Sequence, residues 1–440
     1  MSRIGIRRED KSKWERRVPI VPKHVRQLKE MHDIEVWIQP SDIRVFPDQV
    51  YLDAGARVEE DLSPCPVILA VKEMPADYFD PAHTYIFFAH VIKGQAYNMP
   101  MLQALLNLDC QLIDYEKVTD DHGRRLIFFG QHAGLAGMID TLWAFGRRLG
   151  AEGISNPFTD LLQTHAYDNL DQAKVVLSAL GDRIAREGIP ESIAPVICGF
   201  AGYGNVFKGA EAIIDLLPVE EIEPQHVPDV ARNSTARDRI YKAVFKEQDT
   251  VEPISSADSF ALQDYYDHPE KYRSRFDMYL PHLSILMNCV YWEEKYPRLV
   301  TKQDLRRLYG ASDQPRLRII GDISCDIEGA IEATVKCTEP GAPVYVYDPL
   351  EDRTISGVAG DGPVILAVDI LPSELPREAS AYFSSVLMDY VPAIAKADYS
   401  LSFDDLELPD EIKRAMIVYQ GELTPDYHYL FDYLQEGAGK

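Results

Sequence analysis

The chain has 440 residues, and its 45 lysines and arginines against 70 aspartates and glutamates give a net charge of −25. This acidic balance argues against a nucleic-acid-binding protein, and no apolar run is long enough for a membrane span. The length favours two domains. Residues 1–30 are an exception to the acidic balance, because they carry ten Lys/Arg and four Asp/Glu.

The cysteines and the N-terminal residues indicate a reducing compartment. The six cysteines are scattered without a CxxC pair, and three of them lie in apolar runs. The first residues contain no secretory signal, so we expect a cytoplasmic protein. The eleven histidines include no HxxxH or HxH pair, so no metal site is expected.

Short apolar runs that predict strands alternate with amphipathic stretches that predict helices. In the first third of the chain, strands are predicted over Ile34–Ile38, Val67–Val71, Tyr85–Ala89 and Gln111–Tyr115, and helices over Pro22–Met31 and Gln95–Leu108. A long helix is predicted over residues 134–150. A second series of strands is predicted over Ala194–Gly199, Val219–Glu223, Leu283–Asn288, Leu317–Ile323, Val344–Tyr347 and Val364–Asp369.

One more helix is predicted over Pro376–Ile394. Residues 255–282 are rich in Tyr, His and Asp and are expected to form a loop-dominated insertion, and residues 400–440 show few strand signals. The pattern predicts an α/β fold with two Rossmann-like domains, each with a parallel sheet, and a cleft between the domains.

A glycine-rich loop follows the first strand of the second series. Gly199, Gly202 and Gly204 precede a helical stretch that includes Asn205 and Val206. A strand, a glycine turn and a helix N-terminus form the usual seat of a dinucleotide pyrophosphate. Glu223, 19 residues after Gly204, is placed to accept hydrogen bonds from ribose hydroxyls. The spacing departs from GxGxxG, and a plain strand–helix turn is the alternative.

Titratable side chains follow three predicted strands of the first series. Lys72 and Glu73 follow one strand, His90 follows the next with Lys93 and Gln95 just beyond it, and Glu116 follows the third. Ligands of parallel α/β sheets bind at the carboxyl ends of the strands. We therefore expect Lys72 and His90 to form an acid–base pair that Glu73 or Glu116 tunes. A surface lysine, a hydrogen-bonded histidine and a helix cap are the alternatives.

Two further groups of charged residues are candidates for binding. Arg16 and Arg17 precede a helix start that contains prolines, and arginine binds carboxylates as a two-pronged fork. We expect them to bind an anionic substrate, although a solvated basic surface is the alternative. Asp322 and Asp326 follow a strand of the second series and are expected near a nicotinamide, or else are turn residues.

Several segments together resemble lysine–2-oxoglutarate reductase, the lysine-forming type of saccharopine dehydrogenase. They are RREDKSKWERRVPIVPKH, VKEMP at 71–75, FFAHVIKGQ at 87–95, LIDYEKVTDDHGRR at 112–125, FGQHAGLAGM at 129–138, GYGNVFKGA at 202–210, ISCDIEGAIE at 323–332 and VDILPSELPREAS at 368–380. This enzyme occurs alone or as the N-terminal half of aminoadipic semialdehyde synthase, and the chain length fits the reductase alone. A more distant likeness is to alanine dehydrogenase and the NAD-binding part of transhydrogenase.

The resemblance implies that L-lysine and 2-oxoglutarate condense to saccharopine with NADH or NADPH, or that the reverse, lysine-forming oxidation occurs. It implies acid–base roles for Lys72 and His90, a substrate-carboxylate role for Arg17, and positions near the reacting centre for Glu116 and near the nicotinamide for Asp322. The alternatives are another opine-type reductive amination and a dinucleotide-binding protein without catalysis.

The predicted domains are a substrate domain over 1–136 and 373–440 and a dinucleotide domain over 137–372. No nucleic acid, membrane or metal is expected to bind, and a homo-oligomer is compatible with the sequence. The expected dinucleotide-binding residues are Gly199, Gly202, Gly204, Asn205, Val206, Glu223, Asn288, Asp322, Asp326, Asp369 and Leu371.

Overall fold

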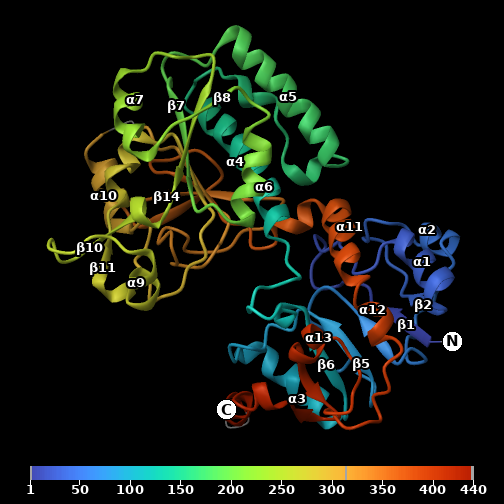
Figure 1. Cartoon of the computed structure of the whole chain (residues 1–440). Coiled ribbons are helices and arrows are strands. Elements are labelled where there is room, and N and C mark those ends of the chain that lie inside the picture. The colour runs from blue at the N-terminus through green and yellow to red at the C-terminus, as the bar shows by residue number, and fades with distance from the viewer. Residues whose placement is uncertain (1, 313–314, 438–440) are drawn as a thin grey trace. The chain divides into compact units, whose positions relative to one another are not determined.

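The computed structural model describes residues 2–312 and 315–437, with side chains described as far as Gln435 (Figure 1). The chain divides into two compact units. The first unit runs to Phe129 and resumes at Pro376, and the second unit is Gly130–Leu375. Each unit is built on an eight-stranded sheet.

The sheet of the first unit has the order β18-β17-β6-β5-β4-β1-β2-β3, and its six strands from β6 to β3 are parallel. The strands are β1 (Ser2–Ile6), β2 (Ile34–Ile38), β3 (Arg57–Val58), β4 (Val67–Leu69), β5 (Thr84–Phe87), β6 (Gln111–Asp114), β17 (Met416–Tyr419) and β18 (Glu422–Leu423). The last two are antiparallel, so the C-terminal segment, which showed few strand signals, extends this sheet.

Helices cover both faces of this sheet. They are α1 (Pro22–His32), α2 (Asp48–Asp53), α3 (Met99–Asn107), α11 (Pro376–Leu387), α12 (Val391–Ile394), α13 (Asp410–Arg414) and α14 (Leu430–Gly437). Successive side chains of a strand point to opposite faces. Leu69 accordingly packs in the core with α1 and α11, whereas Ile68 packs in the core with α3. The helix predicted over Pro376–Ile394 is interrupted between α11 and α12, because Pro392 in the first turn of α12 has no N–H to continue the hydrogen bonds of α11.

The sheet of the second unit has the order β15-β14-β16-β13-β12-β7-β9-β8. Six strands are parallel, and β14 and β15 at one edge are antiparallel. Its strands are β7 (Val196–Ala201), β8 (Val219–Glu221), β9 (Ile240–Phe245), β12 (Ile285–Asn288), β13 (Ile319–Asp322), β14 (Val344–Asp348), β15 (Arg353–Ser356) and β16 (Val364–Leu366). The predicted α/β class with two Rossmann-like sheets is confirmed, with antiparallel strands at one edge of each sheet.

The helices of the second unit are α4 (Gly130–Ala151), α5 (Leu170–Glu187), α6 (Asn205–Ile214), α7 (Val227–Asn233), α8 (Glu247–Thr250), α9 (Leu262–Asp267) and α10 (Lys302–Gly310). The long helix predicted over 134–150 is α4. In the 255–282 insertion, α9 lies before β11 (Tyr272–Ser274), which pairs with β10 (Val251–Pro253). In the described part of the chain, every helix is too short or too polar to cross a bilayer.

Helices α4 and α6 lie side by side in Figure 1 and touch through two glycines. A Cβ on Gly134 would lie 1.9 Å from the carbonyl oxygen of Val206. A Cβ on Gly209 would lie 2.0 Å from the carbonyl oxygen of Gln131. Both positions therefore need glycine because the two backbones approach so closely. This contact sets the position of α6, the helix that follows the glycine-rich loop.

Candidate functional site

The carboxyl ends of β1 and β4 are joined through the buried side chain of Glu9. Its Oε1 accepts a hydrogen bond from the Val71 N–H at 2.7 Å, and its Oε2 accepts one from the Lys72 N–H at 3.1 Å. Burial, reinforced by the nearby charge of Glu15, raises the pKa of Glu9 well above its ordinary value. Glu9 thus holds the start of the segment that carries Lys72 and Glu73, a role that the sequence analysis missed.

Arg17 lies beside this segment and forms a buried ion pair with Glu15. The guanidinium Nε and Nη2 of Arg17 donate to the two carboxylate oxygens of Glu15 at 2.7 and 2.6 Å. The guanidinium carbon lies 4.4 Å from the centre of the Phe129 ring. Arg17 is 5% exposed and Glu15 is 2% exposed, so the pair is shielded from water. The two-pronged contact that was predicted between Arg17 and a carboxylate is therefore made with Glu15 of the protein itself.

The ammonium of Lys72 lies in the field of this pair. Burial and the positive charge of Arg17 lower the pKa of Lys72, while the carboxylates of Glu15 and Glu73 act in the opposite direction. Burial opposes ionisation of Glu15, but Arg17 and Lys72 outweigh it and hold its pKa below the ordinary value. A half-buried lysine with a lowered pKa can release and accept a proton nearer to neutral pH than an ordinary lysine.

Glu73 connects His90 to Lys11. The Nδ1 atom of His90 lies 3.3 Å from Oε2 of Glu73, and the ammonium of Lys11 donates to Oε1. Burial opposes the charge on Glu73, but the contacts to His90 and Lys11 lower its pKa to about 2. Glu73 is therefore ionised at neutral pH and presents a negative charge to the His90 ring.

The backbone of His90 has a left-handed conformation with a φ of 49°. The buried Asn98 side chain holds this turn, because its Nδ2 donates to the carbonyl oxygens of Ala89 at 3.0 Å and His90 at 3.2 Å. The imidazole stacks on the Phe88 ring, with 6.3 Å between the ring centres. These contacts fix where the imidazole of His90 lies relative to Glu73.

A second carboxyl group, that of Asp114, lies close to His90. Asp114 ends β6, is fully buried, and accepts the Glu116 N–H at 2.8 Å through Oδ1. Burial raises its pKa to about 7, although the charge of His90 acts in the opposite direction. The strand predicted over Gln111–Tyr115 drew attention to Glu116 beyond its end, but the structure adds Asp114 to this edge of the sheet.

Four other predicted site residues form hydrogen bonds with partners other than Lys72 and His90. The carboxylate of Glu116 accepts a hydrogen bond from the Arg125 guanidinium. The exposed Arg16 donates through Nε to the Ile43 carbonyl oxygen at 3.2 Å. The Lys93 N–H donates to the Gln95 side chain at 3.1 Å, and the ammonium of Lys93 is exposed. Roles for Glu116, Arg16, Lys93 and Gln95 in substrate binding stay predictions.

In the second unit, the glycine-rich loop joins the end of β7 to α6. Gly202 has a left-handed φ of 93°, and a Cβ there would lie 2.9 Å from the Cys289 carbonyl oxygen after β12. Gly204 caps α6, and a Cβ there would meet no atom within 4 Å. The first N–H groups of α6, on Asn205 and Val206, have no acceptor within the helix. Open space and unpaired N–H groups fit a pyrophosphate.

Two buried polar residues lie at the adjacent ends of β12 and β13. Asn288 donates through Nδ2 to Asp322 Oδ1 at 2.8 Å, and the Thr334 hydroxyl donates to Asp322 Oδ2 at 2.5 Å. Burial raises the pKa of Asp322 to about 6, and these hydrogen bonds limit the rise. Strands β7, β12 and β13 are neighbours, so the sheet brings Gly202, Asn288 and Asp322 to one edge.

The remaining predicted dinucleotide residues are more scattered. Glu223 is exposed and follows β8, the edge strand that β9 separates from β7. Asp326 and Asp369 are exposed, and each lies beyond the end of its strand. Leu371 is 1% exposed and packs in the core of the unit with α4. Cofactor contacts of these four residues stay predictions.

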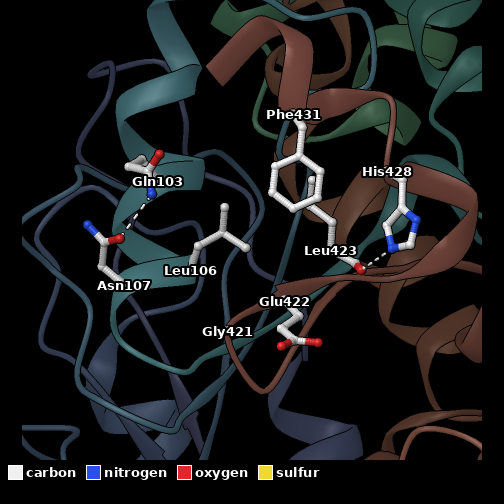
Figure 2. A pocket seen from close by; sticks show the side chains of 8 residues that line it. All are labelled: Gln103, Leu106, Asn107, Gly421, Glu422, Leu423, His428 and Phe431. Carbon is white, nitrogen blue, oxygen red and sulfur yellow. Dashed lines mark hydrogen bonds between the residues drawn. The ribbon is translucent and has the colours of Figure 1, made fainter. Parts of the chain in front are cut away.

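A pocket of about 470 Å³ lies elsewhere in the first unit, between α3 and the C-terminal segment (Figure 2). Its lining includes Gln103, Asn107 and His428, and Figure 2 shows the His428 ring turned toward the Leu423 carbonyl oxygen. The His428 Nε2 atom lies 3.0 Å from this oxygen. None of the predicted site residues lines this pocket, so it does not bear on the chemistry of Lys72 and His90. Within the described residues, no group of three His, Cys, Asp or Glu side chains is arranged to hold a metal ion.

Comparisons with known proteins agree with this architecture. Residues 5–136 match the alanine dehydrogenase/PNT N-terminal domain. L-alanine dehydrogenase has a similar structure, with a TM-score of 0.61 and 17% identity over 98% of this chain and 99% of that one. A transhydrogenase from Sinorhizobium meliloti gives a TM-score of 0.56 and 14% identity over 96% of this chain and all of that one. At such identities the likeness concerns the fold alone.

Sequence relatives are more specific. Alpha-aminoadipic semialdehyde synthase of Arabidopsis thaliana is 36% identical over 97% of this chain and 41% of its own length. The mitochondrial enzyme of Bos taurus is 35% identical over 97% of this chain and 47% of its own length. The chain therefore spans less than half the length of these relatives. Saccharopine dehydrogenase [NAD(+), L-lysine-forming] of Yarrowia lipolytica is 27% identical over 90% of this chain and 93% of its own length. The chain is thus similar in sequence to the aminoadipic semialdehyde synthases and to the L-lysine-forming saccharopine dehydrogenases, and its residues 5–136 match the alanine dehydrogenase/PNT N-terminal domain.

Proposed function

We propose that the chain is an NAD(P)-dependent oxidoreductase that condenses L-lysine with 2-oxoglutarate to form saccharopine, or catalyses the reverse, lysine-forming oxidation. The observation that carries this proposal is the group of Lys72, Glu73 and His90 at the carboxyl ends of β4 and β5, next to the buried pair of Arg17 and Glu15. The names of the relatives, whose aligned region covers nearly the whole chain, support the same substrates.

The proposed role of Lys72 is that of a general base. An amine attacks a ketone only in its neutral form, so the incoming ammonium group must first lose a proton. Burial and Arg17 lower the pKa of Lys72, and a neutral Lys72 can accept this proton. Glu15 and Glu73 limit the lowering, which keeps Lys72 basic enough for the task.

The proposed role of His90 is that of a general acid. The tetrahedral carbinolamine loses its hydroxyl group as water, and this departure needs a proton. Glu73 contacts Nδ1 of His90, so Nε2 is the atom proposed to give its proton to the departing hydroxyl group. In the reverse direction His90 accepts a proton from the attacking water, and Lys72 returns one to the departing amine.

Arg17 is proposed to bind a carboxylate of the 2-oxo acid. Nε and Nη2 are held by Glu15, which leaves the outer N–H groups of the guanidinium for a second carboxylate. In a protein with a net charge of −25, two anionic ligands must rely on such local positive groups. The role of Glu15 is then to fix the orientation of the guanidinium.

The glycine-rich loop of the second unit is proposed to hold a nicotinamide dinucleotide. Gly202, Gly204 and the N–H groups of Asn205 and Val206 would hold the pyrophosphate, and Asn288 and Asp322 would lie toward the nicotinamide. The chemistry that this cofactor supplies when bound is hydride transfer.

The decisive experiment measures oxidation of NADH and NADPH with 2-oxoglutarate and a panel of amines that includes L-lysine. Turnover with lysine, with saccharopine as the product, is the expected result. Turnover with another amine only would replace this function by a different opine-type reductive amination. Nucleotide binding without any turnover would show a non-catalytic binding protein.

The roles of the side chains are tested separately through pH–rate profiles. Lys72→Met should remove one limb of the kcat/KM profile and His90→Gln the other, with a loss of about 100-fold or more in each case. Lys29→Met, a change to an exposed lysine on α1 that is not a predicted site residue, tests whether the loss is specific for Lys72. Profiles that neither Lys72→Met nor His90→Gln alters would refute the acid–base assignment.

A further inference from the structure

Strand β7, which precedes the glycine-rich loop, has β12 on one side and β9 on the other. Its neighbour on the side away from β12 is therefore β9 and not β8, the strand that follows the loop in sequence. After α6 the chain forms β8 at the edge of the sheet and then returns through α7 to β9, which pairs with β7 along its length. In dinucleotide-binding folds, the acidic residue that binds the adenosine ribose follows the strand next to the glycine-loop strand. By topology, this position lies after Phe245 and not at Glu223.

Glu247 occupies this position and faces the glycine-rich loop. The Gly202 N–H donates to the Phe245 carbonyl oxygen at 3.1 Å, which places the loop against the end of β9. The hydroxyl of Tyr203, between the two loop glycines, donates to the Glu247 carboxylate at 3.1 and 3.3 Å. Glu247 is therefore tied to the loop that would hold the pyrophosphate.

The 255–282 insertion supplies a second donor to the same carboxylate. The Tyr266 hydroxyl, from α9, donates to Oε1 of Glu247 at 2.7 Å. Both donors are neutral, and in the described part of the chain Glu247 forms no ion pair with a cation. The carboxylate thus keeps an uncompensated negative charge and lone pairs that can accept further hydrogen bonds.

The charges around Glu247 add to this negative character. Lys246 precedes it, and its ammonium lies 5.9 Å from the centre of the Tyr203 ring. Asp249 follows it in α8 and interacts electrostatically with Lys246, Arg275 and Glu223. With Glu247, the groups that interact with Asp249 give three carboxylates and two cations in this part of the unit, and this excess of negative charge disfavours an additional phosphate.

We propose that Glu247, held by Tyr203 and Tyr266, binds the hydroxyl groups of the adenosine ribose and excludes a 2′-phosphate. The chain is then specific for NAD(H) over NADP(H), and the insertion acts as part of the nucleotide site through Tyr266. This proposal rests on the proposed function in that it assumes a nicotinamide dinucleotide at the glycine-rich loop. It assigns ribose binding to Glu247 because of the strand order, whereas spacing along the sequence had predicted this role for Glu223.

The test is calorimetric binding of NADH and NADPH to the full chain without amine or 2-oxo acid, so that turnover plays no part. The wild-type protein should bind NADH about 10- to 100-fold more tightly than NADPH, the range expected for hydrogen bonds to a charged group. Glu247→Gln should reduce this ratio toward one, and Glu247→Arg should reverse it. Tyr266→Phe should weaken NADH binding several-fold.

Glu252→Gln is the matched control, because Glu252 is a surface carboxylate on β10 that pairs with Arg273. It should leave both dissociation constants unchanged. Thermal unfolding of each variant confirms that the chain is folded. A ratio that changes with Glu223→Gln and not with Glu247→Gln would overturn the proposal, as would equal binding of NADH and NADPH by an active wild-type protein. Failure to bind either nucleotide would overturn the proposed function as well.

Discussion

Replacement of Gly209 by alanine tests whether the contact between α4 and α6 positions the glycine-rich loop. The new Cβ would lie 2.0 Å from the Gln131 carbonyl oxygen and 2.9 Å from the Leu135 nitrogen, both in the backbone of α4. Non-bonded heavy atoms prefer a separation of about 3.5 Å, so the two helices must move apart by about 1 Å or more. Neither obstacle is a side chain that can rotate away.

The expected cost is about 3 kcal/mol, at the upper end of the range for overpacking, since two backbones must separate. In a unit of this size such a loss lowers the Tm by about 6–12 °C. An exposed helical glycine behaves in the opposite way, because alanine stabilises a helix by about 0.5–1 kcal/mol. The sign of the change in Tm therefore distinguishes a close helix contact from an ordinary helical position.

Scanning calorimetry of the wild type and of Gly209→Ala measures this change, with Gly150→Ala as the matched control. Gly150 lies in α4, the helix that Gly209 of α6 contacts, and a Cβ on Gly150 would meet no atom within 4 Å. The control should be neutral or slightly stabilising. Because α6 carries the N–H groups of the loop, Gly209→Ala should also weaken NADH binding. A Tm that is unchanged or raised in Gly209→Ala would refute the close approach of α4 and α6.

Three further predictions concern the first unit. Arg17→Ala should raise the KM for the 2-oxo acid far more than the KM for the nucleotide, and equal increases would exclude a substrate-binding role. Arg17→Lys is the folding control, because loss of the positive charge that pairs with the buried Glu15 costs about 3–5 kcal/mol of stability. Asp114 has a pKa of about 7 in the folded chain and an ordinary value near 3.8, so its contribution to stability is full at low pH and is lost as the pH rises to 7. The wild-type Tm should therefore fall between about pH 4 and 7, and Asp114→Asn should reduce this fall. The same slope in both proteins would contradict the raised pKa. Asn98→Ala should lower kcat and leave the nucleotide affinity unchanged, since it releases the left-handed turn at His90; an unchanged kcat would show that the turn holds without Asn98.

The strands and their order in the chain were largely predictable because buried parallel strands are continuous apolar runs. Ile34–Ile38 is β2 residue for residue, and the runs before Lys72 and His90 are β4 and β5. Strands β1 and β9 were missed. Charged residues interrupt both of them, Arg3 in β1 and Lys242 in β9. Arg3 pairs with Glu35 on the neighbouring strand β2. Lys242 is neutralised by Glu211, Asp215 and Glu221, which lie far from it in sequence.

The missed strand β9 explains why Glu247 was overlooked. Spacing along the chain pointed to Glu223, because an acidic residue about 20 positions after the loop is the usual signal. Strand order depends on which apolar surfaces pack together over long sequence distances, and no local pattern records it. For the same reason the roles of Glu9 and Glu15 were not predicted. In the sequence they are two acidic residues in a basic segment, and only the fold shows that both are buried, next to Lys72 and Arg17.

The sequence by itself determined the residue types at the strand ends, the glycine-rich loop and the α/β class, since these follow from local periodicity and from motifs that are contiguous in the chain. The first thirty residues, with their local excess of positive charge, show what only the tertiary structure decided. Three of their cations pair with acidic residues distant in sequence, Arg3 with Glu35, Arg8 with Glu60 and Lys11 with Glu73. Burial and pairing depend on contacts between distant segments, and they alone decide which charges remain to act on a substrate.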